Sequence, residues 1–231
     1  MNIALWNVDH AKRFSRIQNE VSTLDADIVI LTEADTRITH PLLPLRHSSL
    51  TGLDESEDAG LCSTYRKSEA RTMIFSRFEK VREHIVSDPY TNCCVDLITP
   101  EGVEIRVLAT IVGVQGYKEF WWQRDFNSLL TDLSPTGKNL AAPNLILAGD
   151  VNVNMHQMPE NQITHKRHKL VELMRQFSLY MPTLGYKMAN HLLLGTHFTG
   201  GVTSLPMHEK ISDHHLVMVK GIMPISERAA M

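Results

Sequence analysis

Length, composition and charge place this chain among globular proteins. It has 231 residues, and its 23 Lys and Arg against 26 Asp and Glu leave a formal net charge of −3, which excludes a polybasic or an acidic tail. With 43% hydrophobic and 21% charged residues it can bury a core, which excludes wholesale disorder. Because no internal repeat or composition shift divides the chain, we predict a single domain over residues 1–231.

The cysteines and the N-terminal residues bear on the compartment. The chain has 3 cysteines, of which Cys93 and Cys94 are adjacent, and it has no C-x-x-C pair. This pattern favours a reducing compartment over a disulfide framework or a structural zinc site. The first residues lack the charged and apolar regions of a signal peptide, and no run reaches the roughly 18 apolar residues of a membrane span. We therefore expect a cytoplasmic protein.

The first seventy residues predict a strand, a helix, a second strand and a long connection. The short apolar run 3–8 is typical of a strand, and Phe14, Ile17, Val21 and Leu24 have helical spacing. The continuous run 28–31 is rich in β-branched residues and predicts a strand buried on both faces. Residues 40–70 contain prolines, glycines and an acidic cluster, which indicates a long surface connection.

The remaining elements mix strands and helices. Strands are predicted at 72–76, 85–87, 93–99 and 103–112, with a hairpin turn at 100–102, and together they resemble an antiparallel meander. This argues against an open doubly wound sheet, which needs regular alternation of strands and helices. Further along, we predict helices over 118–133 and 166–177, and strands at 144–148, 191–194 and 215–222.

Polar residues recur where the predicted strands begin or end. Asn7 and Asp9 close the first strand, and Glu33 follows the second. The strand at 144–148 stops before Asp150 and Asn152, and Asp213-His214 begin the last strand. Each residue alone is typical of a turn or a helix cap. Five such coincidences indicate a site at one edge of a sheet.

These segments resemble an ordered family signature. Trp6-Asn7-Val8-Asp9, Leu31-Thr32-Glu33, Ile74-Phe75-Ser76-Arg77, Gly149-Asp150-Val151-Asn152 and Ser212-Asp213-His214 are similar to those of the endonuclease/exonuclease/phosphatase superfamily, which includes deoxyribonuclease I and exonuclease III. Their order matches from residue 3 to residue 219. The resemblance implies an α/β fold, a four-layered αββα sandwich with two mainly antiparallel sheets packed face to face and helices outside.

The resemblance also implies a divalent-metal-dependent hydrolase of phosphoric esters, most simply a phosphodiesterase or nuclease. Hydrolysis needs a hard cation and a deprotonated water in line with the leaving group. Glu33 is the expected main ligand of Mg²⁺ (or Mn²⁺), with Asp9, Asn7 or Asp213 in support. We expect Asp150 to accept the proton of the attacking water.

Two further roles complete the expected catalytic set. Asn152 lies two residues after Asp150, on the same side of an extended segment, and is expected to donate to water or phosphate. His214, which the S-D-H triplet identifies, is expected to stabilise the phosphoryl oxygens or to exchange a proton.

Two positions depart from the family pattern. Family members commonly carry a second His, or a Tyr, after the central strand, where this chain has Ile111 and Val112. They also usually hold the S-D-H histidine with an Asp, and the best match here is Asn190, which accepts a hydrogen bond but carries no charge. His191 and His197 are candidates for the missing group, although a structural role is favoured for both.

The partner expected from these features is a nucleic acid, single-stranded rather than duplex, or a small phosphate ester. A pI near 6.4 argues against strong duplex binding. Trp121-Trp122 beside Arg124 could stack on a base, although core packing is favoured, and Lys12 is read as part of a solvated helix face. Two alternatives stay open: a phosphomonoesterase, and a catalytically weak family member that binds phosphate or nucleic acid.

Overall fold

The computed structural model describes residues 1–51, 68–113, 119–156, 164–206 and 211–225. Three α-helices are found there, α1 (Phe14–Thr23), α3 (Glu119–Leu133) and α4 (His165–Gln176), together with a short 3-10 turn, η1 (Asp9–Ala11). The strands are β1 (Ile3–Asn7), β2 (Ile28–Asp35), β3 (Leu45–Ser48), β4 (Glu69–Ser76), β5 (Glu79–His84), β6 (Cys93–Ile98), β7 (Glu104–Ile111), β8 (Leu145–Asp150), β9 (Asn190–Leu194), β10 (Phe198–Ser204) and β11 (Val217–Pro224).

The strands form two sheets that are mainly antiparallel. The first has the order β10-β11-β1-β2-β4-β3, and only β1 and β2 run parallel in it. The second has the order β5-β6-β7-β8-β9, and only β7 and β8 run parallel. The parallel strands β1 and β2 end at the same edge of the first sheet, and the end of β8 meets them there, because Asn7 contacts Asp150.

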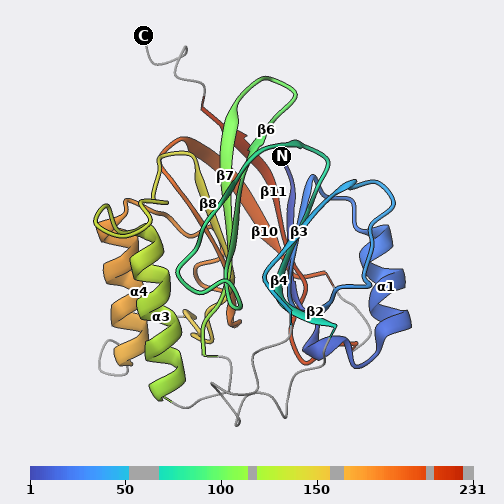
Figure 1. The fold of residues 1–231 in the computed structure, drawn as a ribbon, viewed down its shortest axis with the longest axis horizontal. Coiled ribbons are helices and arrows are strands. Elements are labelled where there is room, and N and C mark those ends of the chain that lie inside the picture. Colours follow the sequence, from blue (N-terminus) through green and yellow to red (C-terminus); the bar gives the residue numbers. More distant parts are fainter. Residues whose placement is uncertain (52–67, 114–118, 157–163, 207–210, 226–231) are drawn as a thin grey trace.

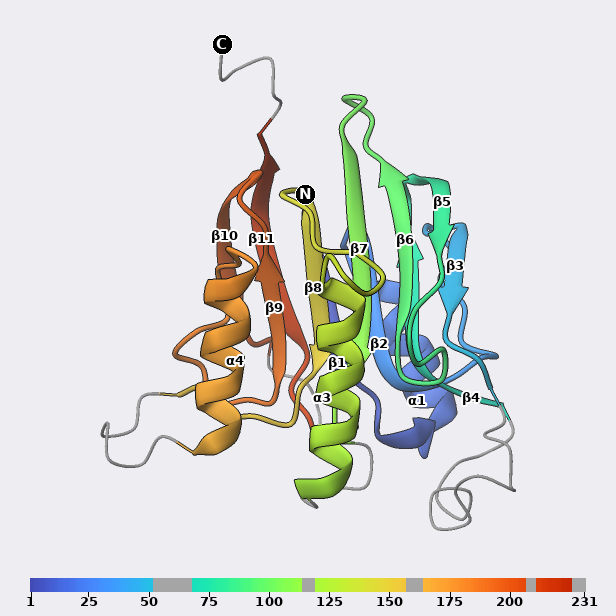
Figure 2. The same ribbon diagram turned by 60° about the vertical axis from the view of Figure 1, so that its left-hand side comes forward.

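The two sheets pack face to face and helices cover their outer faces (Figures 1 and 2). Alternate residues of β1 and β2, such as Ile3 and Ile30, pack against Val107 and Ile146 of the second sheet. The opposite face of β2 packs against Ile17 of α1. Helices α3 and α4 cover the second sheet with a cluster that includes Trp122, Phe126, Leu129 and Leu170. The predicted four-layered sandwich is confirmed.

Several details differ from the prediction. Strand β4 pairs with β2 and β3 in the first sheet, so the expected meander over 72–112 is divided between the two sheets. Residues 85–87 are not a strand, because Ile85 is 79% exposed and the pairing strand is the preceding β5. In α3, Trp122 is fully buried, as the core packing favoured for it predicts, while the neighbouring Phe120 is 71% exposed.

Strands β3, β5 and β10 were not expected. Each lies at or near a sheet edge and carries polar or glycine residues, so none has the apolar run that marks a buried strand. No helix among the described residues is long and apolar enough to cross a membrane.

Candidate active site

The polar residues at the ends of β1 and β8 meet across the two sheets. Asn7 is the last residue of β1 and Asp150 the last of β8, and both are 1% exposed. Asn7 Nδ2 donates to Asp150 Oδ2 at 2.8 Å, while Asn7 Oδ1 accepts from the backbone N–H of Asp9 at 2.9 Å. Both ends of the Asn7 amide are therefore engaged, and its contacts orient the Asp150 carboxylate.

The turn containing Ser212-Asp213-His214 is tied to the same edge. Ser212 Oγ donates to the carbonyl of Asn7 at 2.7 Å, and Trp6 Nε1 donates to the carbonyl of His214 at 3.2 Å. These bonds place the His214 imidazole between two carboxylates: Nδ1 lies 3.8 Å from Asp150 Oδ2, and Nε2 lies 3.7 Å from Asp213 Oδ1. His214 therefore faces Asp150.

A group of potential metal ligands forms beside this turn. Asp9, His10 and Glu33 each offer a ligand atom, and these three atoms lie within 4.8 Å of one another. Glu33 and Asp9 were expected as ligands, whereas His10 was not. Asp213 is outside this group in the described part of the chain, and its side chain is 68% exposed. Its carboxylate faces solvent and His214, and a supporting role of Asp213 at the metal stays a prediction.

The backbone at Glu33 is unusual for a strand residue. Its φ is 53°, a conformation that residues other than glycine rarely adopt. The pairing of β2 with β4 passes from Thr32 to Ala34 and leaves Glu33 out. Such a conformation carries a strain of roughly 1–3 kcal/mol, which the surrounding structure must offset. This irregularity in the strand accompanies a side chain directed at the candidate metal site.

The surroundings of Glu33 disfavour the ionised form of its carboxyl group. Burial raises its pKa from 4.5 to about 7, and the negative charges of Asp150 and Glu69 add to this effect, while His10 and His214 oppose it. The imidazole of His10 lies beside this carboxyl group, with Nε2 at 3.4 Å from Glu33 Oε2. A divalent cation would stabilise the ionised form, so this donor set fits the metal that the resemblance implies.

Lys12 contacts a candidate metal ligand, whereas the sequence indicated a solvated helix face for it. Its Nζ lies 2.5 Å from Asp9 Oδ1, and the hydrogen bond to Asp9 is the main reason that its pKa is raised. The charges of Asp213 and Glu33 raise it further, so the three carboxylates surround one region. The side chain remains 58% exposed and available to a phosphate.

Asn152 makes contacts at the ends of both β7 and β8. Its backbone N–H donates to Asp150 Oδ1 at 2.9 Å, which closes an Asx turn at the end of β8. Its side-chain Nδ2 donates to the carbonyl of Val112 at 2.8 Å rather than pointing into open space. Asn152 therefore connects the ends of β7 and β8, and its donation to water or phosphate stays a prediction.

Asn190 does not hold the imidazole of His214. It lies directly opposite Asp150 in the β8–β9 pair, and its Nδ2 donates to the backbone carbonyl of His215 at 3.4 Å. Its buried Oδ1 has no hydrogen-bond partner within the described residues. The strand register places Asn190 at the site but turns its amide toward the backbone, so the expected bond is absent.

The two histidines considered for the missing second group do not supply it. His191 is fully buried, where Nδ1 lies 3.1 Å from Thr183 Oγ1 and Nε2 lies 2.8 Å from the carbonyl of Val153. Burial lowers its pKa. Ile111 and Val112 are buried apolar residues, as their types predict. The family position after the central strand therefore carries no polar side chain here.

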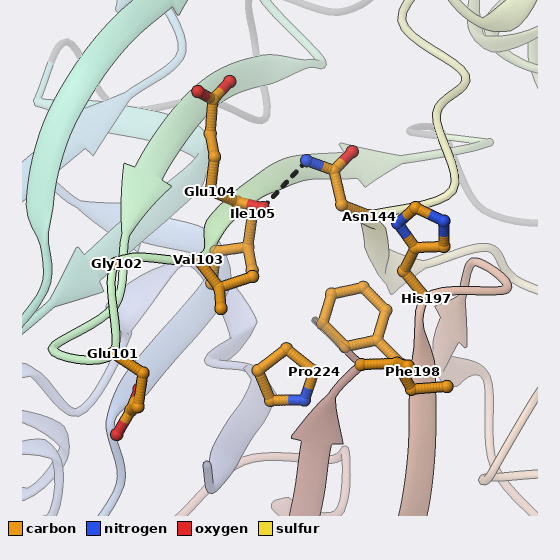
Figure 3. Close-up of a pocket in the computed structure, with 10 residues that line it drawn as sticks. Glu101, Gly102, Val103, Glu104, Ile105, Asn144, His197, Phe198 and Pro224 are labelled. Atoms are coloured by element: carbon orange, nitrogen blue, oxygen red, sulfur yellow. Dashed lines mark hydrogen bonds between the residues drawn. The ribbon is translucent and has the colours of Figure 1, made fainter. Parts of the chain in front are cut away.

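His197 belongs to the opposite end of the sandwich. It borders a cavity of about 650 Å³ that is lined by the β6–β7 turn and by the first residues of β7 and β10 (Figure 3). Asn144 points toward β7 there, and its Nδ2 donates to the carbonyl of Glu104 at 2.8 Å. Since Asp150 is at the far end of β8, this cavity is separate from the polar edge.

Sequence reasoning missed His10 and Glu69. His10 Nδ1 lies 2.8 Å from Glu69 Oε1, and Glu69 begins β4. The only available signal was that His10 follows the candidate ligand Asp9 directly. The turn that directs it inward has φ values of 48°, 56° and 48° at Asp9, His10 and Ala11, which no propensity of these residues predicts.

Comparison with known proteins relates this geometry to a family. The model of the Endonuclease/Exonuclease/phosphatase family matches residues 4–214. No curated protein matches the chain by sequence.

Solved structures share the fold at low sequence identity. A 3′-5′ exonuclease (NExo) from Neisseria meningitidis is 16% identical with a TM-score of 0.62, covering 95% of this chain and 99% of that one. The Neisseria 3′ phosphatase NExo bound to a product DNA hairpin is 17% identical with a TM-score of 0.58, covering 95% and 98%. The catalytic domain of Xenopus laevis APE2 is 14% identical with a TM-score of 0.63, covering 98% and 93%.

Proposed function

The chain belongs to the endonuclease/exonuclease/phosphatase family, and from this premise we propose that its polar edge cleaves phosphodiester bonds with the help of a divalent cation. The predicted class of enzyme, a hydrolase of phosphoric esters, is confirmed by the membership. The observation that carries the narrower proposal is the hydrogen bond from Asn7 to Asp150. It brings a buried carboxylate from one sheet to the candidate metal ligands of the other.

Glu33 and Asp9 would hold the cation. When bound there, Mg²⁺ or Mn²⁺ offsets the negative charge that develops on the phosphoryl oxygens. Glu33 brings a carboxyl group that is ready to ionise when positive charge arrives, because burial has raised its pKa to about 7. Asp9 is held by Lys12 at 2.5 Å, and this lysine also gives an incoming phosphate a cation to approach.

Asp150 would act as the general base. It is buried, and its two carboxylate oxygens accept from Asn7 Nδ2 and from the backbone N–H of Asn152. These bonds hold the carboxylate in one orientation, in which it accepts a proton from the attacking water while the P–O bond to the leaving group breaks. Asn7 and Asn152 thus act on the reaction through Asp150.

His214 would stabilise the phosphoryl group as it reacts. Its backbone is held on both sides, by Ser212 and by Trp6, and its imidazole lies between the carboxylates of Asp150 and Asp213. An N–H directed at a phosphoryl oxygen from this position adds positive potential near the attacked phosphorus. This role needs no second histidine at Ile111 or Val112.

A single-stranded nucleic acid is the substrate that the surroundings of the site favour. Arg124 lies over the ring of Trp121 at 4.4 Å, and Phe120 beside it is 71% exposed. Trp122, on the same turn of α3, donates to the carbonyl of Val151, the residue between Asp150 and Asn152. An aromatic ring with a stacked guanidinium can take a base by stacking.

A phosphomonoesterase is the second candidate. One structural neighbour is named a 3′ phosphatase and holds product DNA, so this fold accommodates removal of a terminal phosphate. The same metal ligands and base would serve both reactions, because the attacked phosphorus is alike. A catalytically weak binding protein is the third candidate, since the second histidine or tyrosine of the family is replaced by apolar residues.

A reducing compartment, the cytoplasm, completes the proposal. Cys93 and Cys94 are buried free thiols, and burial raises the pKa of Cys93 to about 12, which keeps it protonated and unreactive. Cys62 lies outside the described residues.

Turnover of two chromogenic esters tests the proposed function. With Mg²⁺ or Mn²⁺ we expect hydrolysis of bis-p-nitrophenyl phosphate, loss of this activity with EDTA, and loss in Glu33→Gln. Glu172→Gln makes the same chemical change on exposed α4 and is the matched control. Faster turnover of p-nitrophenyl phosphate would favour the monoesterase, and turnover indifferent to EDTA and to Glu33→Gln would exclude the metal mechanism. Single-stranded and duplex oligonucleotides then test the substrate.

A further inference from the structure

His10 is directed into the candidate metal site by a strained turn. Asp9, His10 and Ala11 all have positive φ, between 48° and 56°. For residues other than glycine this conformation is unfavourable, and its persistence needs support from the surroundings. Two kinds of contact provide it. The backbone N–H groups of Ala11 and Lys12 donate to the carbonyls of Val8 and Asp9, and the His10 ring contacts two carboxylates. The result is an imidazole whose Nε2 lies 3.4 Å from Glu33 Oε2.

The other ring nitrogen of His10 is held by a buried carboxylate. Nδ1 lies 2.8 Å from Glu69 Oε1, and the Glu69 side chain is 1% exposed. With Glu69 ionised, its carboxylate only accepts, so the bond is made by a protonated Nδ1, and Nε2 is the nitrogen that faces Glu33. A carboxylate that orients an imidazole in this way, while the second ring nitrogen faces the other ligands, is typical of metal-binding histidines.

The donor atoms already have the spacing of a coordination site. The ligand atoms of Asp9, His10 and Glu33 lie within 4.8 Å of one another. Two of the donors are carboxylate oxygens and one is an imidazole nitrogen. Oxygen-only sets suit Mg²⁺, whereas a set that includes imidazole raises the affinity for first-row transition ions.

We propose that His10 is a nitrogen ligand of the catalytic cation, oriented by Glu69, and that it makes this site prefer transition ions such as Mn²⁺ over Mg²⁺. The inference rests on the proposed function, because it concerns the cation that Glu33 and Asp9 would hold. On binding, Nε2 gives up any proton that it carries to solvent and donates its lone pair to the ion. Glu69 acts as a positioning residue in this arrangement.

The competing interpretation is that protonated His10 takes the place of a cation. Its contacts with Glu33 and Glu69 would then be ion pairs that neutralise the site permanently. The two interpretations predict opposite effects of removing the ring. A ligand lost from the site weakens Mn²⁺ binding, whereas a competing positive charge lost from the site strengthens it.

Pulsed electron paramagnetic resonance of bound Mn²⁺ tests the ligand directly, independently of activity. We expect a ¹⁴N coupling from a coordinated imidazole in the wild-type protein and its loss in His10→Asn. Asparagine tolerates a positive φ better than most residues, so this variant keeps the turn. His214→Asn is the matched control, because it removes the other nearby imidazole and should keep the coupling.

Calorimetric titrations of the same proteins give the selectivity. His10→Asn should weaken Mn²⁺ binding by about 10- to 100-fold and Mg²⁺ binding much less, and Glu69→Gln should fall between His10→Asn and wild type. Mn²⁺ that binds without a ¹⁴N coupling, a coupling that disappears only in His214→Asn, or tighter Mn²⁺ binding in His10→Asn would each overturn the inference. All three results are compatible with metal-dependent turnover, so they would contradict only the role of His10. Absence of any Mn²⁺ binding would contradict the proposed function as well.

Discussion

Two buried carboxylates in this protein differ in the partners that compensate their charge. Asp96, in the middle of the second sheet, is fully buried and accepts from Arg106 Nε at 2.7 Å and Nη2 at 3.1 Å. Burial alone would raise its pKa, but the hydrogen bonds from Arg106 outweigh that effect and the pKa is lowered. Glu33, near the end of β2 in the first sheet, lies 3.4 Å from the imidazole of His10 and makes no ion pair with an arginine among the described residues, and burial raises its pKa to about 7.

The difference separates charges that serve the fold from charges that serve a ligand. Asp96 is compensated within the chain, so its ionised form belongs to the stable native state. Glu33 is compensated incompletely, so its ionised form depends on positive charge from outside. Buried carboxylates of the second kind are candidates for function, because the fold bears an energetic cost for them that an external cation removes.

The largest expected effect concerns the chemical step at the edge. Asp150→Asn removes the proposed base and keeps its shape, so kcat for bis-p-nitrophenyl phosphate at saturating Mn²⁺ should fall by about 10²- to 10⁴-fold. Asp25→Asn, the same change at an exposed position, is the control. Turnover within a few-fold of wild type in Asp150→Asn would show that Asp150 is not the base.

The next largest effect is expected from removing the charge of Asp96. Asp96→Asn leaves Arg106 without its anionic partner inside the sheet, and the free energy of unfolding should fall by about 3 kcal/mol in urea titrations. Because the pKa of Asp96 is lowered in the folded protein, its contribution is present above pH 3.8 and is lost as the pH falls through the folded pKa. Activity per folded molecule should be unchanged. An unchanged free energy of unfolding would show that the pairing of Asp96 with Arg106 does not stabilise the fold.

The opposite sign is expected at Glu33. Its folded pKa of about 7 is above the ordinary 4.5, so the metal-free protein binds the extra proton only when folded. Its contribution to stability is therefore full below pH 4.5 and is lost as the pH rises toward 7. Glu33→Gln should stabilise the metal-free protein at pH 8 by on the order of 2 kcal/mol. A loss of stability in this variant would show that Glu33 is compensated like Asp96.

The smallest effect separates substrate binding from chemistry. Trp121→Ala removes the ring that Arg124 covers, so the KM for a single-stranded oligonucleotide should rise by about fivefold, equivalent to about 1 kcal/mol. Hydrolysis of bis-p-nitrophenyl phosphate, which has no base to stack, should stay the same. Trp121→Phe retains a stacking surface and should restore most of the affinity. Equal KM values in all three proteins would show that Trp121 does not bind the substrate.

The placement of the site was predictable from the sequence, while its internal contacts were not. Short apolar runs indicate where β1, β2 and β8 end, the parallel pair β1–β2 brings Asn7 and Glu33 to one edge, and the packing of the two sheets adds Asp150. The partners of the side chains depend on register and on backbone conformation set by distant residues. Asn190 faces Asp150 because of the β8–β9 register, yet its amide bonds to His215.

The fold shows the same division. Buried strands and the helices that cover them follow from hydrophobic spacing, and their expected positions agree with the structure within a few residues. The edge strands β3, β5 and β10 carry polar residues on exposed surfaces and are held by pairing with neighbours, which a local pattern does not record. His10 belongs with them, since its position depends on three left-handed residues in succession.

Calorimetric titration of Mn²⁺ into metal-free protein at pH 7.5 tests the central claim most directly, that the buried charge of Glu33 is held for a cation. We predict saturable binding in the wild type, the same binding in Asp96→Asn and in the exposed control Glu172→Gln, and loss of binding in Glu33→Gln. Equal Mn²⁺ binding in Glu33→Gln and wild type, or no binding in either, would contradict the account.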